Sequence, residues 1–305
     1  MVKPNAKKIR KNGPSGSHQV NWLWGQQLVA DTIEANRWQV YELFITAEVS
    51  HRYRPLLKSK NTERIEIEIV SESRLEELSK TAEHGGIVAR VSKYPYESLE
   101  NLRQLLQPVR VSLESDPTTS TPNDISVDAT RLHPKDLKMP ADRAINPSLL
   151  LRQPLIVLVD RIQDTFVFAS ILRCCENAAV TGVIVGEFCQ AQVTTQVARA
   201  TEGAVNHFPI FRTESLVDAA NSMKEVGFKL IAVDVLATQS LCETPLTSAT
   251  AIFVGSEPVG IDPDLKSMCD HVVKIPSFGR STSLPASVTA GIMLYEIRRQ
   301  QRSKS

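Results

Sequence analysis

The chain has 305 residues, of which 42% are apolar and 23% are charged, and its formal net charge is +1 at pH 7. This composition excludes a wholly disordered chain and a collagen-like one. No apolar run approaches the roughly 20 residues that are needed to cross a bilayer, so we expect no membrane-spanning segment. A charge so close to zero gives no overall attraction to nucleic acid.

The first residues differ from the rest of the chain in charge. Residues 1–17 are predicted to form a flexible basic tail, which either contacts phosphate groups or only keeps the chain soluble. No apolar stretch follows the basic residues, which excludes a secretory signal. The basic side chains are Lys3, Lys7, Lys8, Arg10 and Lys11.

The cysteines are odd in number and show no C-x-x-C spacing, so neither a disulfide framework nor a zinc site is indicated. We expect free, mostly buried thiols, a cytoplasmic protein and no bound metal. The cysteines are Cys174, Cys175, Cys189, Cys242 and Cys269.

Residues 18–107 alternate apolar strands with amphipathic helices, as a small α/β domain does. Helical spacing predicts helices over 25–36 and 73–82, and apolar or alternating segments predict strands over 41–49, 65–70 and 85–94. Residues 108–150 are rich in Ser, Thr, Pro and Asp, which indicates a linker between two domains.

Residues 151–305 continue as strand, helix, strand, helix. Strands are predicted over 154–160, 181–186, 208–213, 229–234 and 250–257, and helices over 168–180, 192–204, 215–227 and 287–301. The continuous apolar run at 154–160 is typical of a strand buried on both faces of a parallel sheet. We therefore predict a doubly wound α/β domain.

Ligands of open parallel sheets bind beyond the carboxyl ends of the strands, so the loops after Val159, Val254 and Ile275 are candidate sites. The Gly-rich loop 255–260 lacks the Lys and Ser or Thr of a P-loop, and G-x-G-x-x-G is absent, which argues against NTPases, kinases and standard nicotinamide dehydrogenases. No G-x-S-x-G elbow indicates a hydrolase. His84 and Arg90 are candidate RNA contacts, with a turn or simple surface placement as the alternative.

Three segments resemble the motifs of SpoU/TrmH-type RNA 2′-O-ribose methyltransferases of the SPOUT superfamily. They are DRIQDTFVFASILRCCENAAVTGVIV (160–185), GSEPVGI (255–261) and KIPSFGRSTSLPASVTAGIMLYEIRR (274–299). ATEGAVNHFPIFR (200–212) looks like the stretch between the first two motifs, and EHGGIVARV (83–91) like the end of the family's small N-terminal domain. The resemblance covers most of the chain except the tail and the linker.

The resemblance implies an α/β fold with a C-terminal trefoil knot at 151–305, a rare exception to unknotted chain topology. It also implies a small N-terminal α/β domain that binds the substrate. S-adenosylmethionine would bind in the knot, the knotted domain would form a homodimer, and the substrate would be structured rRNA or tRNA. No DNA or membrane partner is expected.

The resemblance also assigns residues to the site. Arg173, Glu257 and Ser283 would be catalytic; a helix-surface arginine, a helix cap and a turn residue are the respective structural alternatives. A guanidinium stays protonated, so Arg173 would hold a phosphate and stabilise charge on the ribose oxygen. The cofactor-facing positions would be Gly255, Glu257, Gly260, Ile275, Ser283 and Leu284.

The chain departs from the family pattern at three positions. Val167 and Pro285 stand where the family has asparagines, and Ala169 stands where it has glycine. Loss of a positioned polar group can lower a catalytic rate by roughly 10²- to 10³-fold. The leading hypothesis is an RNA 2′-O-methyltransferase, and the alternative is a catalytically degenerate RNA-binding protein such as a ribosome-assembly factor. As a third possibility, Pro258 and Pro285 reshape the pocket for another ligand.

Overall fold

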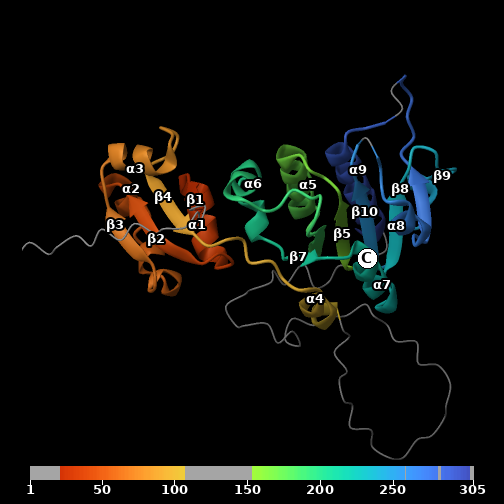
Figure 1. The fold of residues 1–305 in the computed structure, drawn as a ribbon, viewed down its shortest axis with the longest axis horizontal. Coiled ribbons are helices and arrows are strands. Elements are labelled where there is room, and N and C mark those ends of the chain that lie inside the picture. The colour runs from red at the N-terminus through yellow and green to blue at the C-terminus, as the bar shows by residue number, and fades with distance from the viewer. Residues whose placement is uncertain (1–20, 107–152, 258, 281–282, 303–305) are drawn as a thin grey trace, which may run out of the picture.

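The computed structural model describes residues 21–106, 153–257, 259–280 and 283–302. The predicted tail and linker lie outside these residues. Figure 1 shows two sheets, each with its own helices: an N-terminal domain and a larger C-terminal domain. An α/β protein with two such domains was predicted, and this fold class is confirmed.

The N-terminal domain has a mixed sheet in the order β1-β4-β2-β3, in which β2 and β3 are parallel and the other pairs are antiparallel. The helix α1 packs on one face and α3 on the other, because the apolar side chains alternate between the faces. The elements are β1 (Asn21–Trp24), α1 (Gln26–Ala35), β2 (Val40–Ile45), α2 (Ala47–Arg52), β3 (Glu66–Ile69), α3 (Glu72–Ser79) and β4 (Ile87–Val91), with two 3₁₀ turns, η1 (Leu56–Lys58) and η2 (Lys60–Thr62).

One predicted strand of this domain is too long. The expected strand 41–49 ends at Ile45, and α2 begins two residues later. The reason is local, because the Thr46 hydroxyl accepts a hydrogen bond from the Val49 amide at 3.4 Å and caps the new helix.

The C-terminal domain contains a parallel sheet of seven strands in the order β7-β6-β5-β10-β8-β11-β9. Its strands are β5 (Leu155–Asp160), β6 (Gly182–Gly186), β7 (Ile210–Thr213), β8 (Lys229–Val233), β9 (Gln239–Ser240), β10 (Thr250–Gly255) and β11 (His271–Lys274). All residues of β5 are buried, as its continuous apolar sequence predicts for a central strand.

Helices cover both faces of this sheet, so the predicted doubly wound arrangement is confirmed. Val157 of β5 belongs to the core on the side of α5 and α9, while Leu158 belongs to the core on the side of α4, α7 and α8. The helices are α4 (Leu99–Leu106), α5 (Thr165–Asn177), α6 (Thr195–Ala200), α7 (Leu216–Glu225), α8 (Pro263–Ser267) and α9 (Ala286–Arg302), with η5 (Ala204–Asn206) and η6 (Leu241–Glu243) as 3₁₀ turns.

The helix α4 follows the N-terminal domain in sequence but packs on the C-terminal one. Its Leu102 is fully buried in the core beneath β5 and α7, and the Arg103 Nη2 donates to the Ser222 hydroxyl at 2.7 Å. Just before it, Glu97 pairs with β7 and covers that edge strand. The chain is therefore anchored on the second domain before the undescribed segment 107–152 begins.

The two domains meet at the segment 195–207, the α6–η5 corner. Figure 1 shows α6 lying between the N-terminal domain and α5. Arg37 Nε donates to the Asn206 carbonyl at 2.8 Å, and the Arg199 guanidinium lies 3.7 Å from the centre of the Trp24 ring. Nearby, the Tyr96 hydroxyl accepts a hydrogen bond from the Val193 amide at 2.6 Å. Burial raises the pKa of Tyr96 to about 12. The apolar core runs on from one domain into the other.

The free thiols were predicted correctly, but their burial was not. All five cysteines are free; Cys175 is buried, while Cys189 in a loop and Cys242 in the 3₁₀ turn η6 are exposed. Burial raises the pKa of Cys269 to about 12, so this thiol stays protonated at neutral pH.

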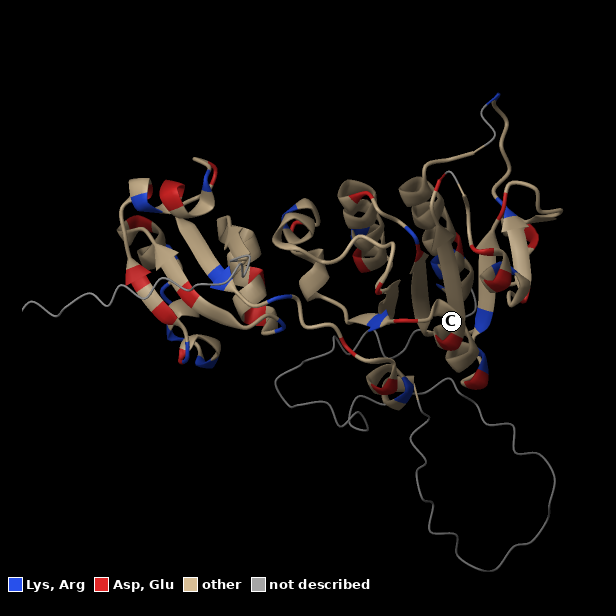
Figure 2. Cartoon of the chain, viewed as in Figure 1, with Lys and Arg blue, Asp and Glu red and all other residues tan. Residues whose placement is uncertain are grey.

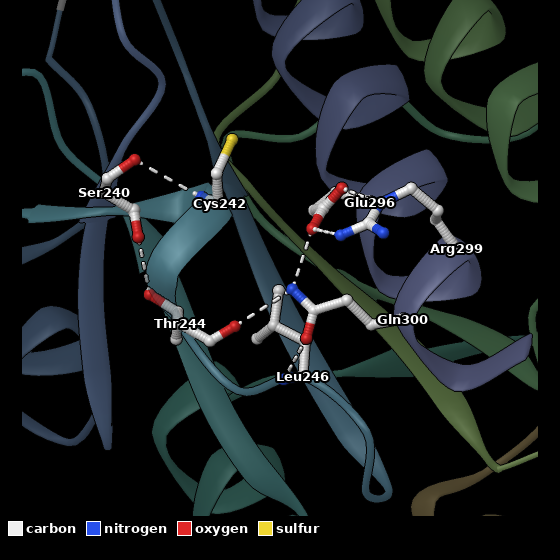
Figure 3. Close-up of polar contacts among 7 residues, drawn as sticks. All are labelled: Ser240, Cys242, Thr244, Leu246, Glu296, Arg299 and Gln300. Atoms are coloured by element: carbon white, nitrogen blue, oxygen red, sulfur yellow. Dashed lines mark hydrogen bonds and ion pairs between the residues drawn. The ribbon is translucent and has the colours of Figure 1, made fainter. Parts of the chain in front are cut away.

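A polar network holds the C-terminal helix α9 against the segment 240–246 (Figure 3). Glu296 accepts two hydrogen bonds from Arg299 and one from Gln300, each at 2.8 Å. Gln300 then donates to the Thr244 carbonyl at 3.0 Å and accepts from the Leu246 amide at 2.9 Å. The bonds from Arg299 are the main reason why the pKa of Glu296 lies below 4.5, although burial opposes them.

This network predicts an acid-sensitive contribution to stability. The folded state prefers the ionised Glu296, so its contribution is complete above the unfolded pKa of about 4.5 and disappears as the pH falls through the lower folded pKa. We expect Glu296→Gln to lower the free energy of unfolding by ~1–3 kcal/mol at pH 7. Thermal melts between pH 7 and pH 3 measure the effect. Glu77→Gln, which removes an exposed pair with Arg74, is the control, and identical pH profiles for wild type and Glu296→Gln would contradict the prediction.

Candidate functional site

The loop after β10 is a closed turn that tolerates only glycine at its start. The Gly260 amide donates to the Ser256 carbonyl at 2.7 Å, and the two residues form an isolated bridge. A Cβ on Gly255 would lie 2.5 Å from backbone atoms of Gly260, closer than non-bonded atoms approach. Gly260 itself has a φ of +72°, with open space where its side chain would be. The turn therefore leaves open space beside the Gly260 backbone, at the carboxyl end of a central strand.

Glu257 connects this loop to the start of α9. The Pro285 carbonyl accepts the first helical hydrogen bond, which makes this proline the N-cap residue, but it has no side-chain oxygen to cap the helix. The carboxylate of Glu257 takes over this role and accepts from the Ala286 amide at 3.0 Å. A negative charge at this helix end is also favoured by the helix dipole. Glu257 therefore caps α9 in the structure. Helix capping was one of the two roles that the sequence suggested for this residue.

A second contact joins the loops after β5 and β10. The Asp160 carboxylate is buried and accepts from the Asp262 amide at 2.9 Å. It also pairs with Arg161, which has a φ of +56° and reaches Asp262 at 3.5 Å as well. These contacts hold the carboxyl ends of β5 and β10 together. Ligands of open parallel sheets bind at this end of the strands.

Arg173 lies on the exposed side of α5, and its Nη1 pairs with Glu202 at 3.0 Å. Its neighbour Cys174 contacts the first turn of α9, where the thiol donates to the Ser287 carbonyl at 3.8 Å. No hydrogen bond or ion pair within the described residues joins Arg173 to Glu257 or Ser283. The structure therefore brings Glu257 to the start of α9, and it pairs Arg173 with Glu202.

Three other predicted site residues lie between the end of β11 and the start of α9. Ser283 and Leu284 are exposed just before the helix, and Ile275 is half-buried against the apolar core. The substituted position Val167 lies in the first turn of α5, where its amide is capped by the Asp164 carboxylate at 2.9 Å. Its side chain packs partly on the core.

The two candidate RNA contacts of the N-terminal domain differ in exposure. His84 is only 4% exposed, and its Nδ1 accepts from the Gly86 amide at 3.0 Å, so the turn interpretation is confirmed and surface placement was wrong. Arg90 is half-buried and pairs with Glu42 at 2.6 Å, and it lies 5.0 Å from the centre of the Tyr41 ring. Each of these two side chains already has a partner within the N-terminal domain.

Figure 2 shows that acidic residues gather on β3 and α3, at the edge of the N-terminal domain farthest from the C-terminal domain. This edge would repel phosphate. Basic residues are concentrated instead in the segment between β2 and β3. They are Arg52, Arg54, Lys58, Lys60 and Arg64.

In the part of the chain that the structure describes, no helix is both long and apolar enough to cross a membrane. The same residues contain no group of His, Cys, Asp or Glu side chains that could hold a metal ion.

Comparison with protein families divides the chain as the fold does. The first family, described as RNA 2′-O ribose methyltransferase substrate binding, matches residues 22–97. The second, the SpoU rRNA Methylase family, matches residues 154–295. An α/β RNA methylase domain preceded by a substrate-binding domain is therefore the class of protein that the fold and loops define. The chain belongs to the SpoU/TrmH RNA methylase family.

Two relatives illustrate the extent of the similarity. The chain is 24% identical to YacO of Bacillus subtilis, named for the TrmH family of tRNA/rRNA methyltransferases, over 93% of this chain and 98% of the relative. It is 27% identical to an uncharacterized tRNA/rRNA methyltransferase of Synechocystis, over 92% of this chain but 62% of the relative.

Solved structures support the fold. The SpoU methyltransferase AviRb of Streptomyces viridochromogenes, solved with AdoMet, superposes with a TM-score of 0.65 at 22% identity and covers 92% of this chain and 90% of its own. An AdoMet-bound rRNA methyltransferase from Sinorhizobium meliloti superposes with a TM-score of 0.65 at 18% identity. The match covers 92% of this chain and 87% of the other. These similarities show a shared two-domain architecture.

Proposed function

We propose that this protein is an S-adenosylmethionine-dependent 2′-O-ribose methyltransferase that acts on rRNA or tRNA. The observation that carries the proposal is the closed backbone turn after β10, fixed by Gly255 and joined to α9 through Glu257, in a chain of this family. The printed names of the relatives and the AdoMet bound to two similar structures support the same reaction and cofactor.

The residues present fit this cofactor. The turn exposes backbone beside Gly260, where no side chain occupies the space, and the segment before α9 presents Ser283 and Leu284 to solvent. Backbone groups of these two segments would hold the adenine and the methionine part, with Gly255, Glu257, Gly260 and Ile275 shaping the walls. When bound, S-adenosylmethionine supplies a methyl group on a positively charged sulfur.

The chemistry required of the protein is to orient a ribose hydroxyl and to favour the loss of its proton. A 2′-hydroxyl is a poor nucleophile at neutral pH and gains most from alignment. A guanidinium cannot act as an ordinary base, so the role of Arg173 is to bind an RNA phosphate and to stabilise negative charge that develops on the ribose oxygen. Ser283 would contact the substrate from the other side of the site. Val167 and Pro285 contribute no polar side chain, so more of the rate enhancement depends on Arg173.

We further infer a homodimer through the C-terminal domain and a trefoil knot in that domain, with a cytoplasmic location. The contact between Glu257 and Ala286 supports the knot, because it places the start of α9 against the loop after β10. Val288 and Tyr295 support the dimer, because they are exposed apolar residues seven positions apart on α9 and so share one helix face. Light scattering of the full chain would give twice the 33.8 kDa mass if the dimer forms.

The catalytically degenerate RNA-binding protein stays the alternative, because Val167 and Pro285 replace polar residues. Methyl transfer from labelled S-adenosylmethionine to total RNA of cells that lack the protein tests the proposal directly. Mass-spectrometric mapping should then find a new 2′-O-methyl group. Cofactor binding in calorimetry without any transfer, or no binding at all, would favour the alternative.

A further inference from the structure

Glu202 is held in an unusual backbone conformation at the end of α6. Its φ is +53° and that of Gly203 is +89°. For a residue with a side chain, the left-handed region costs roughly 1 kcal/mol or more, so the surrounding structure must maintain it. Three successive backbone amides close the helix end with hydrogen bonds of 2.9 to 3.0 Å. The amide of Thr201 donates to the carbonyl of Val197, that of Glu202 to Arg199 and that of Gly203 to Ala198. The direction in which the Glu202 side chain leaves the backbone is therefore fixed.

The side chain of Glu202 ends at the guanidinium of Arg173, with a distance of 3.0 Å between Oε1 and Nη1. Among the described residues this is the one ion pair that Arg173 makes, and 49% of its side chain is exposed. A second contact between the corner and α5 lies one helical turn further along, where His207 Nδ1 is 3.4 Å from the Glu176 carboxylate. The corner thus faces α5 with Glu202 beside the arginine.

The same corner also contacts the N-terminal domain. The Asn206 amide donates to the Thr32 hydroxyl of α1 at 3.1 Å in a buried contact, and the Tyr94 hydroxyl donates to the Val205 carbonyl at 3.2 Å. The Asp31 carboxylate lies 3.3 Å from where a Cβ of Gly203 would be, so the residue after Glu202 is pressed against α1. The corner therefore contacts α5 on one side and the substrate-binding domain on the other.

We propose that Glu202 is a positioning residue for Arg173, an inference that rests on the proposed function of this arginine. Glu202 holds one edge of the guanidinium and turns the other edge toward the RNA phosphate and ribose. A long arginine side chain has about 2 kcal/mol of rotamer entropy. A carboxylate in a fixed place already restricts the rotamers of Arg173, so less entropy is lost when RNA binds. Because the corner also carries the substrate-binding domain, Arg173 is oriented relative to the RNA that this domain holds.

Kinetics with total RNA as substrate distinguish positioning from a structural role. We expect Glu202→Ala to lower kcat about five- to tenfold, with an unchanged KM for S-adenosylmethionine and an unchanged Tm, because exposed ion pairs contribute little to folding. Glu202→Gln, which keeps an acceptor oxygen, should lose less. In an Arg173→Ala background, Glu202→Ala should have no further effect. The matched control is Glu77→Ala, which breaks an exposed pair with Arg74 at 2.7 Å.

A second measurement does not depend on turnover. In protein labelled with ¹⁵N-arginine, the Nε–Hε group of Arg173 should show restricted motion in the wild type and free motion in Glu202→Ala. Equal order parameters in the two proteins, or additive effects of the two substitutions on kcat, would overturn the positioning role. A wild type that transfers no methyl group would contradict the proposed function instead, and the NMR result would then decide the positioning role by itself.

Discussion

Replacing Arg173 by alanine is expected to reduce methyl transfer to RNA by about 10²- to 10³-fold, the loss seen when a positioned group that stabilises charge is removed. The side chain is half exposed and makes one ion pair, so its removal should leave the fold and the binding of S-adenosylmethionine unchanged. Because Val167 and Pro285 offer no polar side chain nearby, little remains in the described site to replace it. Transfer of a labelled methyl group to total RNA measures the loss.

The control for this variant is Arg74→Ala, which also removes an exposed arginine in a single ion pair, but on α3 of the N-terminal domain. It should retain the wild-type rate. Equal rates for wild type and Arg173→Ala would remove Arg173 from the reaction and favour the interpretation of this residue as an ordinary helix-surface arginine.

The Gly255→Ala substitution is the second change for which we expect a large effect. The new Cβ would lie 2.5 Å from the backbone of Gly260, and backbone cannot move aside as the end of a flexible side chain can. Such overpacking costs about 1–3 kcal/mol of folding free energy. The turn must open to accommodate the methyl group, so we expect the affinity for S-adenosylmethionine to fall by at least about tenfold, or ~1.4 kcal/mol. Calorimetry measures the affinity, and thermal melts measure the stability.

Gly279→Ala provides a matched control. This glycine lies in the segment before α9 and has nothing within 4 Å of an added Cβ. It should bind the cofactor as the wild type does. If Gly255→Ala also binds with wild-type affinity, the turn after β10 is not part of the cofactor site, and our assignment of that site would have to be abandoned.

Long periodic segments could be predicted from the sequence. The strands at β5 and β10 and the helices α5, α7 and α9 lie where apolar runs and helical spacing place them, because each buries a continuous apolar face. Short elements could not be predicted in this way. The strand β9 has two residues and is placed by its pairing with β11, and the missed helix α4 packs on the core of the C-terminal domain. The predicted helix 192–204 is reduced to α6 and a 3₁₀ turn because the corner is fitted between two domains.

Part of the candidate site was also accessible from sequence. The motif resemblance located the loop 255–260, the segment before α9 and Arg173, and the substrate-binding domain ahead of them. It could not say how these residues are used. That Glu257 caps α9 depends on a contact across 29 positions, and that Asp160 ties the two central loops depends on one across 102 positions. Local periodicity contains no information about such pairs.

Apolar periodicity was thus sufficient for the α/β fold class, and the resemblance of three motifs was sufficient for the family, because both depend on the pattern of neighbouring residues along the chain. The pairing of Arg173 with Glu202 and the attachment of the N-terminal domain to the corner that contains Glu202 became visible in the folded protein alone. The reason is physical: a salt bridge or a domain contact is formed between side chains that the chain brings together by burying apolar surface elsewhere, and no feature of either side chain's own sequence neighbourhood specifies its partner.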